Sequence, residues 1–131
     1  MGQPAAKQGD KITASDTHVV LDSNGVSSPL AHRFEGLLTG ELSDDVKIMG
    51  LPAARVGSTA DNFPKHVPTP PGMSFLNAPS NKGTIQSGST TVRINGKAAA
   101  RDGDPAETCS EGPPVVPGKV VVTPRGTVNI G

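Results

Sequence analysis

The sequence predicts an all-β fold of three β-hairpin repeats that surround one axis. Three observations carry this prediction. The 131 residues include 16 glycines and 13 prolines, which is typical of an ordered but turn-rich chain. Aromatic residues make up only 2% of the chain, so there are few large side chains to fill a core. A seven-residue motif occurs three times, which is the signature of a repeat architecture.

The repeated motif starts with Pro-Ala-Ala or Ala-Ala-Ala and continues with a basic residue and, two positions later, a glycine. Its three copies span residues 4–10, 52–58 and 98–104. They are spread evenly over the chain, and a chain of this length is normally one domain. We therefore expect a single domain over residues 1–131, with each copy at the start of one structural unit.

A Val-x-Ile lead-in precedes the second and third copies, at residues 46–48 and 92–94. No lead-in precedes the first copy. The matching segment stands at the other end of the sequence, as Val-Asn-Ile-Gly at residues 128–131. We therefore expect a closing strand over residues 127–131 that pairs beside the N-terminal strand, so that three units enclose the axis.

In each lead-in, apolar residues stand at every second position, which is typical of a strand with one buried face. Each lead-in is followed by residues that favour a turn. Asn95-Gly96 is the stronger turn, because both central positions of a type I′ turn need positive φ. Met49-Gly50 occupies the equivalent place. The motif itself is then a returning strand, followed by a long Pro/Gly-rich loop. In residues 29–49 two glycines disfavour a helix, so at most one short helical turn is expected there.

Charge and hydropathy exclude several functions. The 12 basic and 12 acidic residues balance, and no basic stripe is present, which argues against nucleic acid as a partner. The apolar runs are too short for a membrane span or a signal peptide, so export would use another route. A single cysteine excludes an internal disulfide, so another element must stabilise a chain with so thin a core.

Three histidines and one cysteine are the candidate metal ligands: His18, His32, His66 and Cys109. His18 and His66 each follow the end of a motif copy by eight positions, and Cys109 follows by five. Loops of units that surround an axis converge at one end of it, and His32 lies in the longer first loop. Three imidazoles and one thiolate form a tetrahedral set suited to Zn²⁺. The sequence therefore predicts one structural zinc ion.

Other constellations carry less weight. Asp16, Asp44 and Asp45 could be combined with a histidine and a serine into a hydrolytic site, but nothing in the sequence resembles a nucleophile elbow. The motif residues Lys7, Arg55 and Arg101 are expected to be solvated strand ends or partner contacts. No catalytic residue is predicted.

The motif Pro-Ala-Ala-Arg-x-Gly, the strand before it and the accompanying histidines and cysteine resemble the PAAR-repeat family. Its members are small proteins that cap the spike of contractile injection systems, in type VI secretion or phage-tail-like particles. The resemblance implies a short β-cone with pseudo-threefold symmetry and a zinc ion near the apex. It implies as ligands the same residues that the spacing singles out, His18, His32, His66 and Cys109.

The resemblance also implies a function without catalysis: a tip that sharpens a trimeric VgrG-like spike for membrane piercing, one tip per trimer, with effector proteins as further partners. Apolar base positions such as Val92 and Ile94 would then contact the spike. Such a tip would assemble in the cytoplasm and be ejected with the particle. Two alternatives remain open, a small zinc-dependent hydrolase with an open coordination position and a free-standing secreted adhesin.

Overall fold

The computed structural model describes residues 2–68, 73–111, 117–123 and 128–131. Within these ranges every regular element is a strand, as the sequence predicts. The strands are β1 (Gln3–Pro4), β2 (Lys11–Leu21), β3 (Ser27–Gly40), β4 (Lys47–Ile48), β5 (Leu51–Pro52), β6 (Thr59–Asn62), β7 (Ser74–Phe75), β8 (Lys82–Ile85), β9 (Arg93–Ile94), β10 (Lys97–Ala98), β11 (Pro105–Glu107), β12 (Gly118–Val121) and β13 (Asn129–Ile130).

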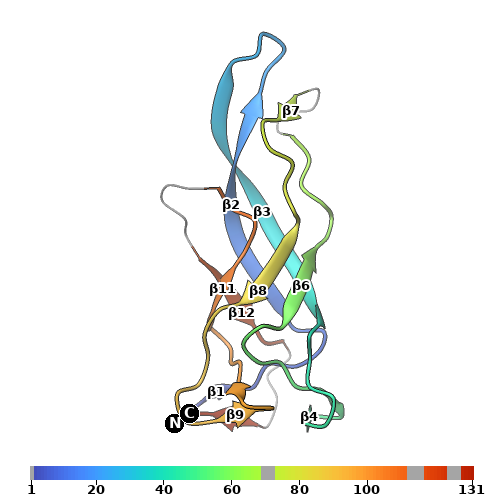
Figure 1. Ribbon diagram of the computed structural model, residues 1–131, viewed down its shortest axis with the longest axis vertical. Coiled ribbons are helices and arrows are strands. Elements are labelled where there is room, and N and C mark those ends of the chain that lie inside the picture. The colour runs from blue at the N-terminus through green and yellow to red at the C-terminus, as the bar shows by residue number, and fades with distance from the viewer. Residues whose placement is uncertain (1, 69–72, 112–116, 124–127) are drawn as a thin grey trace.

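Six antiparallel strands close into a barrel in the middle of the molecule. Their order is β2-β3-β6-β8-β11-β12, and β12 pairs with β2 again through Val120 and Ile12. β2 and β3 continue beyond the barrel as a long two-stranded ribbon, against which the short β7 pairs at Val20 and Leu21. The molecule is therefore elongated, with the ribbon at one end and both termini at the other (Figure 1).

Three short hairpins form the base of the molecule. They are β4–β5, β9–β10 and the pair of β13 with β1, which joins the two ends of the chain through Gln3 and Ile130. The two predicted turns have the expected backbone: φ is 52° at both Met49 and Asn95, and positive at the glycine after each. The closing strand thus pairs as the ring requires, although residue 127 of its predicted span lies outside the described residues.

Backbone hydrogen bonds join the three motif copies into a ring around the axis. The Ala6 N–H donates to the carbonyl of Ala100 at 3.0 Å, Ala100 to Ala54 at 3.1 Å, and Ala54 back to Ala6 at 3.0 Å. All three alanines have no exposed surface. Only a methyl side chain leaves room for three backbones to approach so closely, which explains why the motif is rich in alanine. The predicted pseudo-threefold arrangement is confirmed.

The core consists of two clusters that lie along this axis. At the base, one isoleucine and one alanine from each unit pack together: Ala5, Ile48, Ala53, Ile94, Ala99 and Ile130. Inside the barrel, the largest buried side chain is Phe34, and its ring lies where a Cβ on Gly83 would come within 3.1 Å of it. Ile94 is only 5% exposed, so the expectation that it contacts a partner is wrong.

The first copy of the motif also differs from expectation at its basic residue. Lys7 is 5% exposed, and its ammonium pairs with the Asp10 carboxylate at 3.1 Å. Arg101 pairs with Asp104 at 2.9 Å in the equivalent place. Arg55 has no such partner, because Ser58 stands where the other copies have an aspartate. Lys7 and Arg101 therefore close the turn after the motif instead of pointing into solvent.

Residues 27–40 form a strand of fourteen residues, and no helical turn forms in residues 29–49, which agrees with the expectation of at most one there. β3 pairs with β2 over its length and with β6, so its glycines are placed in a barrel wall. Adding a Cβ to Gly36 would bring it within 2.6 Å of the Asp61 carbonyl, which shows that the glycine permits close strand pairing. Among the described residues, no helix has the length and apolar character to cross a membrane.

Candidate metal centre

The inner face of the β2–β3 ribbon changes from apolar to titratable just above the barrel. Alternate residues of a strand point to one face, and the inward side of β2 carries Ile12, Ala14, Asp16 and His18 in turn. β3 adds His32, whose Cα lies opposite Asp16 in the strand register. The alternation that fills the barrel with apolar side chains therefore also gathers two imidazoles and a carboxylate in one buried place.

His66 approaches the same place from the segment after β6. Its backbone N–H donates to the Asn81 side-chain oxygen at 2.8 Å. Asn62 Nδ2 lies 3.3 Å from His66 Nδ1 and donates to the Asn81 side-chain oxygen at 3.1 Å. Since Asn62 covers Nδ1, the other ring nitrogen, Nε2, faces the ribbon. There it lies 3.0 Å from Asp16 Oδ2.

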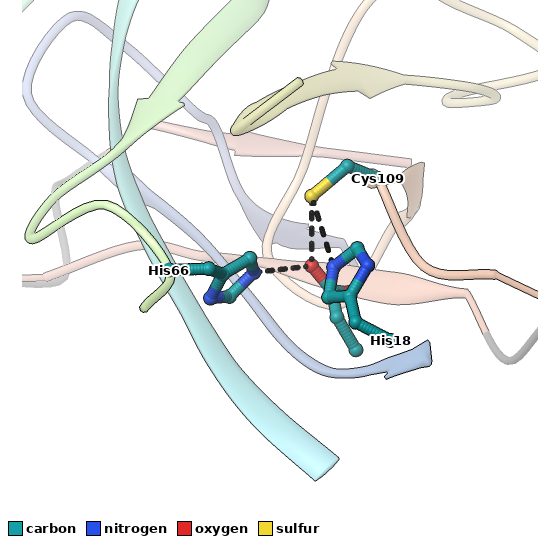
Figure 2. Close-up of side chains that lie close together, drawn as sticks. His18, His66 and Cys109 are labelled. Atoms are coloured by element: carbon teal, nitrogen blue, oxygen red, sulfur yellow. Dashed lines mark hydrogen bonds and ion pairs between the residues drawn. The ribbon is translucent and has the colours of Figure 1, made fainter. Parts of the chain in front are cut away.

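Cys109 lies on the segment after β11, which approaches the site from a side different from the β2–β3 ribbon and the segment after β6. The segment after β11 lies along β2: Thr17 N–H donates to the Ser110 hydroxyl at 2.9 Å, and Glu111 N–H donates to the Thr17 carbonyl at 2.8 Å. Cys109 Sγ is 3.5 Å from His18 Nε2 and 3.3 Å from Asp16 Oδ2. The side chains of His18, His66 and Cys109 thus converge from three sides (Figure 2).

The three imidazole rings form a nearly equilateral triangle. Their centroids are 4.9 Å apart for His18 and His66, and 5.6 Å apart for each of these with His32. Rings that bind one tetrahedral ion through nitrogen at about 2.0–2.1 Å would have centroids about 5 Å apart. Phe75 closes this triangle on its apolar side, with its ring centroid 5.7 Å from that of His18 and 5.4 Å from that of His32.

Two buried imidazole nitrogens, His18 Nδ1 and His32 Nε2, have no hydrogen-bond partner among the residues that the structure describes. The other nitrogen of His32, Nδ1, lies 3.0 Å from the Leu30 carbonyl and must donate to it. In the neutral ring, His32 Nε2 therefore carries a lone pair that faces the site. A buried acceptor without a partner is costly in a folded protein. A metal ion would satisfy it, so the residues present fit a bound cation.

Burial controls the protonation of the candidate ligands. Burial, and next the neighbouring His66 ring, lowers the pKa of His18 from 6.5, which keeps this imidazole neutral and able to bind a metal. Burial raises the pKa of the Cys109 thiol to about 11. Without a cation the thiol is therefore protonated at neutral pH, and it must lose that proton to become a ligand.

The structure brings all four sequence-predicted ligands together, although His18 and His32 lie on strands and not in loops as expected. The donor atoms of Asp16, His18, His66 and Cys109 all lie within 4.8 Å of one another, and His32 is not a member of this group. Sequence reasoning missed Asp16 as a member. The signal that could have found it is the alternation Ile12-x-Ala14-x-Asp16-x-His18, because a single strand face continues from the core to the ligands.

Glu111 supports His18 from outside this set. Its carboxylate Oε2 lies 4.0 Å from His18 Nδ1 and accepts the Val19 N–H at 2.9 Å. A carboxylate on the far nitrogen of a ligating histidine orients the ring and makes it a better ligand. Asn62 and the Leu30 carbonyl occupy the far nitrogens of the other two rings. The rings of His32 and His66 therefore each have a polar group within hydrogen-bond distance behind them, whereas Glu111 lies near His18 Nδ1 without a hydrogen bond to it.

Comparison with known proteins supports the family predicted from the motif. The protein-family model described as PAAR motif matches residues 77–131. This range contains the third copy of the motif, Cys109 and the closing strand, whereas His18, His32 and His66 precede it. No curated protein matches the chain. Residues 77–131 are therefore similar to the PAAR motif family, and the three motif segments of the chain are bonded into one ring.

Proposed function

We propose that this protein is the structural tip that caps and sharpens the trimeric, VgrG-like spike of a contractile injection system. The single observation that supports this most is the ring of hydrogen bonds among Ala6, Ala54 and Ala100. It gives one chain three nearly equivalent units, and three units on one chain match the three chains of a symmetric trimer. The PAAR motif is consistent with the same role.

The surface proposed to contact the spike is the base of the three hairpins. One valine stands just before the first strand of each hairpin, and the three are similarly exposed: Val46 36%, Val92 38% and Val128 41%. Each accepts a hydrogen bond from the matching motif alanine, so they occupy equivalent places. Met49 and Leu51 on the first hairpin add exposed apolar area. Exposed apolar side chains in a threefold arrangement suit a threefold partner.

The proposed role of the metal is to stiffen the part of the tip that meets the target membrane. The ribbon projects beyond the barrel (Figure 1). A zinc ion bound by His18, His32, His66 and Cys109 would tie β2, β3 and two separate segments together. Structural zinc contributes roughly 10–16 kcal/mol of apparent binding free energy in small domains. A centre of this kind would resist fraying under mechanical load.

A hydrolase is the weaker alternative, because catalytic zinc needs an open coordination position. Here the donors surround the place where an ion would bind, and Phe75 covers its apolar side. We therefore propose a protein without catalytic activity. A free-standing adhesin would have no use for three equivalent, exposed base positions. Assembly on the spike in the cytoplasm, ejection with the particle and attachment of effector proteins follow from the proposed role as expectations.

Co-purification with the adjacent spike protein tests this proposal. We expect one copy of this protein per spike trimer by native mass spectrometry. The double variant Val46→Asp and Val92→Asp should abolish the complex while the protein stays folded, because two charges would be buried in the contact. Val26→Asp is the control: Val26 is also an exposed valine, at 58%, but it lies at the tip of the ribbon, away from the base. A stable protein that ignores the trimer would favour the adhesin.

A further inference from the structure

Asp16 is a buried carboxylate without a permanent positive partner. It has no exposed surface, and no lysine or arginine pairs with it in the part of the chain that the structure describes. Thr108 donates its hydroxyl hydrogen to Oδ1. Oδ2 has two neighbours, His66 Nε2 at 3.0 Å and Cys109 Sγ at 3.3 Å. A carboxylate in such a place costs several kcal/mol unless it is compensated.

Both neighbours of Oδ2 are atoms that would bind a metal. Since Asn62 covers Nδ1 of His66, the ring must use Nε2, the nitrogen that faces Asp16. In the metal-bound form the one hydrogen of the neutral His66 ring would lie on Nδ1, toward Asn62, so that Nε2 carries none, and a ligating cysteine is a thiolate without a hydrogen on Sγ. Oδ2 would lose both of its hydrogen-bond donors as the ion binds. It would become a buried charge beside a thiolate unless it bound the ion itself.

The distances agree with direct binding. Donor atoms that share one four- or five-coordinate ion, with bonds of about 2.0–2.3 Å, lie roughly 2.9–3.9 Å apart. The three distances that join Oδ2 to Nε2, Oδ2 to Sγ, and Sγ to His18 Nε2 are 3.0, 3.3 and 3.5 Å. Asp16 Oδ2 therefore lies where a direct ligand would lie, and not in the position of a group that only orients another ligand.

We propose that Asp16 is a direct ligand of the metal centre, through Oδ2, in addition to the four residues that the sequence predicts. The centre then has five donors: Asp16, His18, His32, His66 and Cys109. A dication bound by one carboxylate and one thiolate carries no net charge, which makes it compatible with a buried site. This inference rests on the proposed metal centre and changes its donor set from nitrogen and sulfur to nitrogen, sulfur and oxygen.

Cobalt substitution of the full chain tests the role of Asp16, because Co²⁺ occupies zinc sites and its visible absorption reports coordination number. We expect weak, five-coordinate bands for the wild type. Asp16→Asn should give stronger, tetrahedral bands and at least a tenfold weaker affinity for Zn²⁺, measured by competition with a chelating dye. Thr108→Val is the matched control, because it removes the partner of Oδ1 but no ligand. It should leave the spectrum unchanged.

Two results would overturn the inference: identical cobalt spectra for the wild type and Asp16→Asn, or the same spectral change in Thr108→Val. If no variant and no wild-type protein binds cobalt or zinc, the metal centre itself fails, which is a different outcome from a centre that binds metal without Asp16.

A second variant keeps the question open to experiment if Asp16→Asn does not fold. His32→Ala leaves Asp16, His18, His66 and Cys109, which are a complete tetrahedral set if Asp16 binds. We then expect bound cobalt with tetrahedral bands that do not change when azide is added. If Asp16 is not a ligand, His32→Ala leaves three protein ligands and a water, and azide should shift the spectrum by replacing that water.

Discussion

The base of the molecule and the ribbon above the barrel are stabilised in opposite ways. At the base, three copies of one motif are joined by main-chain hydrogen bonds, and their side chains are small and nearly identical. In the ribbon, five different side chains from four segments meet around one point, and no two play the same part. The base therefore depends on size and backbone geometry, whereas the ribbon depends on the chemistry of individual residues.

This difference explains why the repeat weakens away from the axis. The alanines that touch the axis occur in all three copies, because any larger side chain would separate the three backbones. The loops that follow the copies have different lengths, and within the described residues only the first forms a long two-stranded ribbon. The threefold symmetry is thus kept where the three backbone segments meet at the axis, and it is lost where the single asymmetric metal site lies. The following predictions probe that contrast, starting with the largest effect.

Removal of the metal should destabilise the ribbon far more than the base. For protein prepared with zinc we expect a loss of several kcal/mol in unfolding free energy on chelation, and the same loss in Cys109→Ser without chelator. Amide hydrogen exchange should speed up in β2 and β3 above the barrel and stay slow at the alanines of the axis. Equal acceleration in both regions would show that they do not stabilise independently.

Metal affinity should depend steeply on pH. Because burial raises the pKa of Cys109 to about 11, the thiol gives up one proton on binding at any pH between 7 and 9. The apparent dissociation constant for zinc should therefore fall about tenfold per pH unit in this range. The dependence should become steeper as the pH falls through the lowered pKa of His18, since that imidazole then also loses a proton on binding. Isothermal titration in two buffers of different ionisation enthalpy counts the protons released.

In the protein without metal, His18 should make the fold less stable as the pH falls. A histidine that forms an ion pair with a carboxylate would have the opposite effect. The folded pKa of His18 lies below the unfolded value of 6.5, so the neutral ring stabilises the fold fully above 6.5. This contribution is lost as the pH falls from 6.5 through the lowered folded value. We expect a melting temperature that decreases over this window and a smaller decrease in His18→Gln.

The two ion pairs of the motif offer a comparison within the base. Lys7 and Asp10 have side chains that are 6% and 1% exposed, whereas Arg101 is 24% exposed. Asp10→Ala leaves a buried ammonium without a partner and should cost about 3–5 kcal/mol. Asp104→Ala, where water can reach the guanidinium, should cost on the order of 1–3 kcal/mol. Urea unfolding of both variants measures the difference, and equal losses would contradict the role of burial.

Enlarging an axial alanine should separate the three strands at the base. Ala54→Leu adds volume where there is no exposed surface, and we expect it to cost at least about 1–3 kcal/mol. Ala31→Leu, on the outward face of β3, is the matched control and should change the stability by less than about 0.5 kcal/mol. Thermal unfolding of both proteins, with zinc present, would show whether the axis tolerates a larger side chain.

The smallest effect is expected at the tips of the base hairpins. Met49 and Asn95 occupy the same turn position with the same φ of 52°, a conformation that asparagine adopts more easily than methionine. Met49→Asn should therefore raise the unfolding free energy by about 0.5–1 kcal/mol. If the base docks on a spike, the same change should weaken binding, because it removes exposed apolar surface. A variant that is less stable than the wild type would contradict the comparison of the two turns.

The sequence alone determined the repeat, the strand and turn of each hairpin, and the closure of the ring by the last strand. These depend on local rules: residue size, alternation of apolar side chains and the backbone needs of a turn such as Asn95-Gly96. It also singled out His18, His32, His66 and Cys109, because these are the three histidines and the one cysteine of the sequence. Local rules hold wherever neighbours in the sequence are neighbours in space.

Only the tertiary structure decided the rest. It turned the first loop into two long strands, placed His18 and His32 on them, and brought Asp16 into the site through pairing with β3. It buried Lys7 and Ile94, which looked exposed in sequence. Burial and donor geometry depend on contacts between residues far apart in the chain, such as Asp16 with Cys109. A pattern in the sequence can name the ligands, but the distances between their atoms exist only after the barrel has closed.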